Sequence, residues 1–160
     1  MEIVENVRIP DEEVRFVARI NDEDVGTCSV GSSSYAPTSY LGKTRAYKQD
    51  SGKTIYISWL GVYSNHRGNY IGTRLLYHAM RYFYERGFKY VVLLDASDRV
   101  KRNDSIYRQV GLSYSEGDAD ESDHMIGNIR HILFGKYKGM NGRNGGTNRF
   151  YREEEFNFQT

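Results

Sequence analysis

The sequence predicts one α/β (α+β) domain built on a central mixed β-sheet with a β-α-β crossover. Three observations lead to this fold class. The chain has 160 residues, which is enough to bury a single hydrophobic core. Residues 54–62 are apolar or aromatic at most positions on both faces, as in a central strand covered on both sides. From Ile71 onward, the apolar residues recur at helical spacing instead.

Short strands are expected over residues 1–32. Residues 14–20 mix apolar and basic positions, 21–24 are turn formers, and 25–30 run back as the second arm of a hairpin. The stretch before residue 14 has too few residues between strands to hold a helix. Residues 31–53 show no periodicity and are rich in Gly, Ser, Lys and Tyr. We expect a long loop or an irregular insertion there.

The helix that begins at Ile71 carries an apolar stripe that includes Leu75 and Phe83. Gly87 ends it, with Arg86 in the last turn. Residues 88–95 form the next strand, so that strand, helix and strand make a right-handed parallel crossover.

The rest of the chain alternates short elements with polar loops. A second helix starts near residue 98 or 103 and ends at Gly111, and a strand over 112–116 follows. A further strand lies within 124–137. We divide the chain into a domain over 1–138 and a flexible, Gly-rich C-terminal tail over 139–160, whose aromatic residues favour a homodimer.

Composition excludes several classes of protein. With 22 Lys+Arg against 21 Asp+Glu, the net charge of +1 argues against a dedicated nucleic-acid binder. We expect no signal peptide and no membrane-spanning segment, and the single Cys28 excludes an intrachain disulfide. These features predict a cytoplasmic protein without a membrane partner. The four His residues show no metal-ligand spacing, so no metal is expected.

The stretch from Val62 to Leu76 carries the strongest functional signal. A buried strand ends, a turn with Arg67 and Gly68 follows, and a helix begins. The first N–H groups of a helix lack internal partners and attract anions. Two interpretations remain open from the residues alone: a phosphate or pyrophosphate site, or an ordinary strand-to-helix turn with solvated arginines.

Residues 67–72, Arg-Gly-Asn-Tyr-Ile-Gly, resemble the acyl-CoA pyrophosphate loop of the GNAT superfamily of N-acetyltransferases. That pattern is Gln/Arg-x-x-Gly-x-Gly/Ala, and Arg67 and Gly72 match it. Tyr70 stands where the first Gly is expected. Because φ is negative near a helix N-terminus, we expect a non-Gly residue to fit there and its N–H still to bind the pyrophosphate.

The resemblance, over about residues 14–137, implies a GNAT-like fold without the usual N-terminal helices and acetyl-CoA as acyl donor. Tyr107 and Gly111 resemble the Tyr-x-x-x-Gly end of the second family motif, which implies that Tyr107 protonates the departing thiolate. Val100 stands where the family has an Asn, and Asn103 is a weak substitute. The implied cofactor-binding residues are Leu60, Gly61, Val62, Arg67, Gly68, Asn69, Tyr70, Ile71, Gly72, Thr73, Asn103 and Tyr107.

The general base is not evident. Many members of the family carry a Glu on the central strand, but the equivalent position here is about Tyr56, and residues 54–62 contain no acid. Asp95, at the end of the next strand, is the candidate catalytic residue, although it is also placed to cap a turn. His66 or an ordered water are the other candidates.

The predicted activity is N-acetyl transfer by direct attack of an amine on acetyl-CoA. The acceptor could be a protein lysine, a protein N-terminus, a polyamine or another small amine. The acidic residues of loop 117–123 could attract such a cation, or form a solvated hairpin loop. The alternative is a catalytically inactive GNAT-like module for CoA binding or protein interaction. The absent base, Tyr70 and Val100 favour it.

Overall fold

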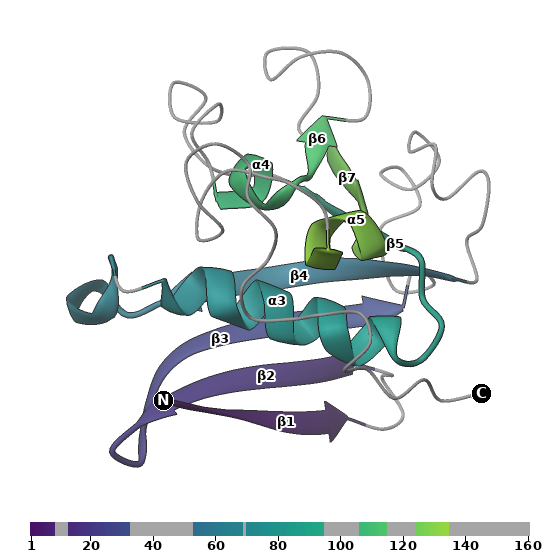
Figure 1. Ribbon diagram of the computed structural model, residues 1–160. Helices are drawn as coiled ribbons and strands as arrows, with labels where there is room; N and C mark the ends of the chain where they lie inside the picture. The colour runs from purple at the N-terminus through teal and green to yellow at the C-terminus, as the bar shows by residue number, and fades with distance from the viewer. Residues whose placement is uncertain (9–12, 33–52, 69, 95–105, 115–123, 135–160) are drawn as a thin grey trace.

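The computed structural model describes residues 1–8, 13–32, 53–68, 70–94, 106–114 and 124–134 (Figure 1). Their elements, in chain order, are β1 (Glu2–Arg8), β2 (Glu13–Ile20), β3 (Glu23–Ser32), β4 (Thr54–Val62), η3 (Ser64–His66), α3 (Ile71–Tyr84), β5 (Tyr90–Leu94), α4 (Ile106–Val110), β6 (Ser113–Tyr114), β7 (His124–Asn128) and α5 (Ile129–Phe134).

One sheet with the strand order β1-β2-β3-β4-β5-β7-β6 contains the seven described strands. The predicted mixed sheet is confirmed, because β4 and β5 pair in parallel and the other neighbouring strands pair antiparallel. β4 has the predicted bounds and lies in the middle of the strand order. β1 pairs directly with β2, from Glu2 opposite Arg19 to Arg8 opposite Glu13.

Helix α3 covers one face of the sheet, where it crosses β2, β3 and β4 (Figure 1). Its apolar stripe meets the alternate positions of the strands that point toward it, such as Phe16 of β2 and Cys28 of β3, which are fully buried. Helix α5 packs beside α3. Burial of apolar area at this helix–sheet interface is the main favourable term in folding.

The predicted end of α3 is confirmed. Gly87 has a φ of 87°, a left-handed conformation that favours glycine. The N–H of Gly87 donates to the carbonyl of Tyr84, and the N–H of Phe88 donates to that of Phe83, each at 3.0 Å. These bonds satisfy carbonyls that the helix leaves open at its end.

The predicted strand within residues 124–137 is confirmed as β7, but the helix that follows it was not predicted. β7 ends at Asn128, and Ile129–Phe134 form α5. The side-chain Oδ1 of Asn128 accepts a hydrogen bond of 3.2 Å from the N–H of His131. This bond caps the helix, and Ile129, Ile132 and Leu133 are buried on one helical face.

The hairpin between β2 and β3 turns more tightly than predicted. Only Asn21 and Asp22, with φ values of 52° and 66°, form the turn, and β3 begins at Glu23 and runs on to Ser32. Two positive φ values in succession are typical of the type I′ turn that suits a tight hairpin. Most of the predicted loop 31–53, the acidic loop 117–123 and the tail 139–160 lie outside the described residues. Among the described helices, none is long and apolar enough to cross a bilayer.

Candidate functional site

Two hydrogen bonds tie the chain between β4 and α3 to the neighbouring strands β3 and β4. The Nε–H of Arg67 donates to the carbonyl of Val62 at 3.0 Å. The N–H of Tyr63 donates to the carbonyl of Val25 on β3, also at 3.0 Å. One of the five N–H donors of Arg67 therefore closes the turn. The guanidinium group also places a positive charge there.

Two residues of this turn are left-handed. Gly68 has a φ of 87°, and a Cβ atom built on it would meet nothing within 4 Å. Tyr70, the N-cap residue of α3, has a φ of 60° and a ψ of 19°. The expectation of a negative φ at Tyr70 is wrong, because the residue precedes the helix and still belongs to the turn. A left-handed conformation costs a residue with a Cβ atom about 1–2 kcal/mol.

The amino end of α3 is open toward this turn. Tyr70 makes no side-chain hydrogen bond to the first turn of α3, which contains no acidic residue. The side chains of Ile71 and Thr73 are buried, so these two residues could reach a ligand only through their backbone. The N–H groups of a first helical turn, together with the helix dipole, favour an anion at this point. Asn69 lies outside the described residues.

Helix α4 packs against this same end of α3. A Cβ atom built on Gly72 would lie 3.3 Å from Cδ1 of Ile106 on α4 and 3.6 Å from Cγ2 of Val62 on β4. Tyr107, the next residue of α4, is half-buried against the core. The predicted end of α4 is confirmed, since Gly111 has a φ of 112° and the N–H of Leu112 donates to the carbonyl of Tyr107 at 2.9 Å.

The structure thus brings the loop, the start of α3 and the Tyr107 segment together. Asp95 and Asn103 lie outside the described residues, and their roles stay predictions.

A β-bulge interrupts β4 beside this region. Ser29 of β3 stands opposite Trp59, and Val30 stands opposite Ile57, which leaves Ser58 as the extra residue. β5 pairs with β4 over residues 54–57 only, so that of the described strands only β3 accompanies β4 beyond this point. A bulge of this kind twists a strand and re-aims its side chains. The polar Ser58 within an apolar run was the signal for it in the sequence.

The bulge also explains why the predicted two-sided cover of β4 is wrong for its second half. Leu60 and Val62 pack against the core, but the Trp59 side chain is 62% exposed. The indole ring lies over Gly61, where its Nε1 would be only 2.9 Å from an added Cβ atom. Gly61, predicted as a cofactor residue, therefore provides the space that the Trp59 ring occupies.

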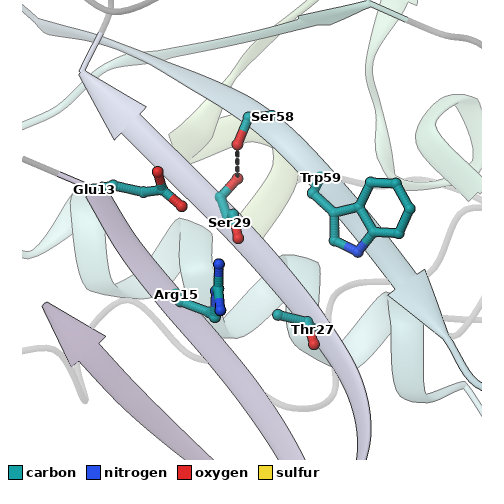
Figure 2. Close-up of a pocket in the computed structure, with 6 residues that line it drawn as sticks. All are labelled: Glu13, Arg15, Thr27, Ser29, Ser58 and Trp59. Carbon is teal, nitrogen blue, oxygen red and sulfur yellow. Dashed lines mark hydrogen bonds between the residues drawn. The ribbon is translucent and has the colours of Figure 1, made fainter. Parts of the chain in front are cut away.

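A cavity of about 490 Å³ opens beside Trp59 (Figure 2). Its described lining residues come from β2, β3 and β4 and, apart from Trp59, are polar; they are Glu13, Arg15, Thr27, Ser29, Ser58 and Trp59. Sequence analysis missed this cavity. The alternation of charged and apolar residues along β2 was the available signal, because it places Glu13 and Arg15 on the same face.

Two chemistries have no support among the described residues. Burial raises the pKa of the Cys28 thiol from its usual 9.0 to about 12. A thiol held in its neutral form is a poor nucleophile. No group of three His, Cys, Asp or Glu side chains in the described part of the chain is placed to hold a metal ion.

Comparison with known proteins identifies the relatives of the chain. The family model described as "Acetyltransferase (GNAT) family" matches residues 3–112. None of the curated proteins compared with the chain matches it.

Several solved structures share the fold. Tetrahymena GCN5 has a TM-score of 0.51 at 14% identity, over 74% of this chain and 69% of its own. PaiA N-acetyltransferase from Thermoplasma acidophilum, solved in complex with coenzyme A, has a TM-score of 0.52 at 15% identity, over 73% and 61%. Aminoglycoside 6'-acetyltransferase type Ii has a TM-score of 0.50 at 24% identity, over 75% and 71%.

Proposed function

Because the chain belongs to the acetyltransferase (GNAT) family and is therefore an acyltransferase, we propose that it transfers an acetyl group from acetyl-CoA to an amine. The observation that carries the choice of donor is the open amino end of α3 behind the turn of Arg67 and Gly68. This end offers backbone N–H groups to a diphosphate, and Gly68 has no side chain that would block its approach. The solved relative in complex with coenzyme A supports the same donor.

In this proposal, the diphosphate lies against residues 67–73. Arg67 supplies positive charge, and Gly68 leaves the space that a phosphate group needs. Gly72 acts indirectly, because its missing side chain lets α4 approach the end of α3.

The thioester arm would run along the second half of β4. Leu60, Gly61 and Val62 lie beyond the last pair between β4 and β5, where the described β5 no longer accompanies the strand. Backbone groups on that side of β4 can hydrogen-bond the amides of the arm, as a neighbouring strand would. The acetyl group would then arrive near the bulge at Ser58.

The proposed chemistry is one direct transfer. The ammonium group of the acceptor first loses a proton, and the neutral nitrogen attacks the thioester carbonyl carbon. A C–N bond forms and the C–S bond breaks with its electron pair on sulfur. The tetrahedral nitrogen loses its second proton, and the thiolate leaves as CoA thiol after it accepts a proton from the Tyr107 hydroxyl. Tyr107 regains its proton from solvent.

The base that removes the proton from the acceptor is proposed to be Asp95 or a water molecule that it holds. Asp95 directly follows β5 in the sequence, and β5 is the strand that pairs in parallel with β4. β4 itself carries no acidic side chain, so a carboxylate base must come from another element.

Isothermal titration calorimetry with acetyl-CoA tests the proposal. We expect saturable binding, and release of CoA thiol when an amine is added. The absence of binding at about 1 mM acetyl-CoA would contradict the proposal. A dissociation constant of about 1 mM corresponds to a binding free energy of only about 4 kcal/mol. Saturable binding without turnover on any amine would instead favour a CoA-binding module. The strain at Tyr70 and the lack of an acid on β4 are the observations that favour this second function.

A further inference from the structure

The cavity beside Trp59 has a built polar arrangement that the transfer chemistry above does not use. Arg15, Ser29 and Trp59 stand directly opposite one another in three successive strands. Ser29 forms the buried floor, and its carbonyl accepts a hydrogen bond of 3.2 Å from the Ser58 hydroxyl. Figure 2 shows the charged groups of Glu13 and Arg15 on one side of Ser29 and the indole of Trp59 on the other.

The two charged residues of this cavity are not paired with other described residues. Neither Glu13 nor Arg15 takes part in the salt bridges of the described chain. The Nε atom of Arg15 is buried and takes no hydrogen bond in the described structure. A buried donor without a partner costs free energy, which a ligand with an acceptor oxygen would recover.

Opposite charges at positions i and i+2 of one strand match a zwitterion. A carboxylate can form a bidentate pair with Arg15, and an ammonium group beside it can pair with Glu13. An α-amino acid carries these two groups on a single carbon atom. The cavity therefore fits the backbone end of a free amino acid better than a simple polyamine, which would meet Arg15 with like charge.

The distance from Glu13 and Arg15 on β2 to Trp59 on β4 sets the length of the acceptor. β2 and β4 lie two strand spacings apart, or about 10 Å. A side chain of four methylene groups reaches about 6 Å from its Cα atom, and the side chains of Glu13 and Arg15 span the remainder. Its terminal ammonium would then lie over the exposed indole of Trp59, a favourable cation–π contact, next to the bulge of β4.

We infer that the acceptor is a free diamino acid of the lysine or ornithine type, acetylated on its side-chain nitrogen. Arg15 holds the α-carboxylate, Glu13 holds the α-ammonium, and Trp59 guides the side-chain amine toward the thioester. The inference rests on the proposed function for its chemistry. It assigns the acceptor site to the sheet face opposite α3, and the transfer step is the one described above.

Binding can be measured without the donor, because Trp59 is the only Trp of the chain. We expect L-lysine to change the tryptophan fluorescence saturably. Cadaverine, which lacks the carboxylate, and 6-aminohexanoate, which lacks the α-ammonium, should each bind at least about tenfold more weakly. The measurement is repeated with CoA, which carries no acetyl group. Unchanged fluorescence at about 10 mM L-lysine and at about 10 mM L-ornithine, with CoA present, would overturn the inference.

Variants separate the two charges. Arg15→Gln should abolish the preference for L-lysine over cadaverine, and Glu13→Gln should abolish the preference over 6-aminohexanoate. Arg19→Gln is the matched control, since Arg19 lies on the same strand but its Nε is 3.0 Å from Asp24 Oδ1. The control should keep both preferences.

The outcomes distinguish this inference from the proposed function. If wild-type protein acetylates cadaverine as well as L-lysine, or acetylates protein lysines but neither diamino acid, the inference is overturned and the proposed function stands. If L-lysine binds with the predicted preferences but acetyl-CoA does not bind, the amino-acid site stands and acetyl-CoA is rejected as the donor.

Discussion

The Cδ1 atom of Ile106 lies 3.3 Å from the point where a Cβ atom on Gly72 would stand. The missing side chain of Gly72 lets Ile106 of α4 lie this close to the first turn of α3, and Tyr107 is the next residue of α4. A Gly72→Ala substitution should push α4 away by a few tenths of an ångström.

We expect Gly72→Ala to lower kcat between about twofold and tenfold, because small displacements of catalytic groups are costly. The free energy of unfolding should change little, since the better helix propensity of Ala, worth about 1 kcal/mol, offsets the crowding. The double variant with Ile106→Val removes the Cδ1 atom and should restore kcat. Failure of this rescue would show that α4 does not depend on the contact.

Gly68 and Gly87 form a matched pair for testing the diphosphate site. Both have a φ of 87°, and a Cβ atom on either would meet nothing within 4 Å. Gly68→Ala and Gly87→Ala should therefore cost similar amounts of stability, about 1 kcal/mol each. Only Gly68→Ala should weaken the binding of acetyl-CoA in calorimetry. Equal affinities in the two variants would place the diphosphate elsewhere.

Tyr70 holds a left-handed conformation at the N-cap of α3. Tyr70→Gly should be more stable to urea than Tyr70→Ala by about 1 kcal/mol, because only the Gly variant relieves the backbone. Both variants lack the ring, so the comparison isolates the backbone term. A more stable Ala variant would mean that Tyr70 is not strained.

Tyr107→Phe removes the proposed proton donor but keeps the ring. We expect kcat to fall by about 10²-fold or more, with the dissociation constant of acetyl-CoA unchanged. Stopped-flow and calorimetric measurements on the same preparation would separate these quantities. An unchanged kcat would remove Tyr107 from the mechanism.

Cys28 should make stability depend on pH in the alkaline range. Burial raises its pKa from 9.0 to about 12, so the folded state favours the neutral thiol. The unfolded chain releases this proton near pH 9, and stability present below that pH is lost as the pH rises toward 12. The loss attributable to Cys28 is about 1.4 kcal/mol per pH unit.

Cys28→Ala is the reference for this effect, because this variant lacks the buried thiol and keeps every other group of the chain. The difference in unfolding free energy between wild type and Cys28→Ala should shrink or reverse above pH 9. In native protein at neutral pH, a thiol reagent should label Cys28 only at the rate of unfolding. Immediate labelling would contradict the burial of the thiol.

The elements with strong periodicity could be predicted from sequence, and those that depend on single polar residues could not. α3 was predictable because its apolar residues repeat at helical spacing over 14 residues, and β4 because apolar side chains fill most of its 9 positions. α5 was missed because its six residues hold too few turns to show a period, and the decisive signal is the cap from Asn128.

The site divides along the same line. The diphosphate site that we propose at residues 67–72 could be recognised from consecutive residues, since Arg67 and Gly72 belong to one short motif. The cavity beside Trp59 could not, because Arg15, Ser29 and Trp59 meet only through the register of three strands. The bulge at Ser58 decides that register, and a shift by one residue would turn Trp59 toward the core.

The strand order also has a consequence for the folding pathway. β1, β2 and β3 pair with their neighbours in sequence, through a two-residue turn in one case, whereas β5 reaches β4 only after the whole of α3. Local pairings close small loops and form fastest. We therefore expect the N-terminal hairpins to gain protection from amide hydrogen exchange first. The parallel pair of β4 and β5 would then assemble after these hairpins.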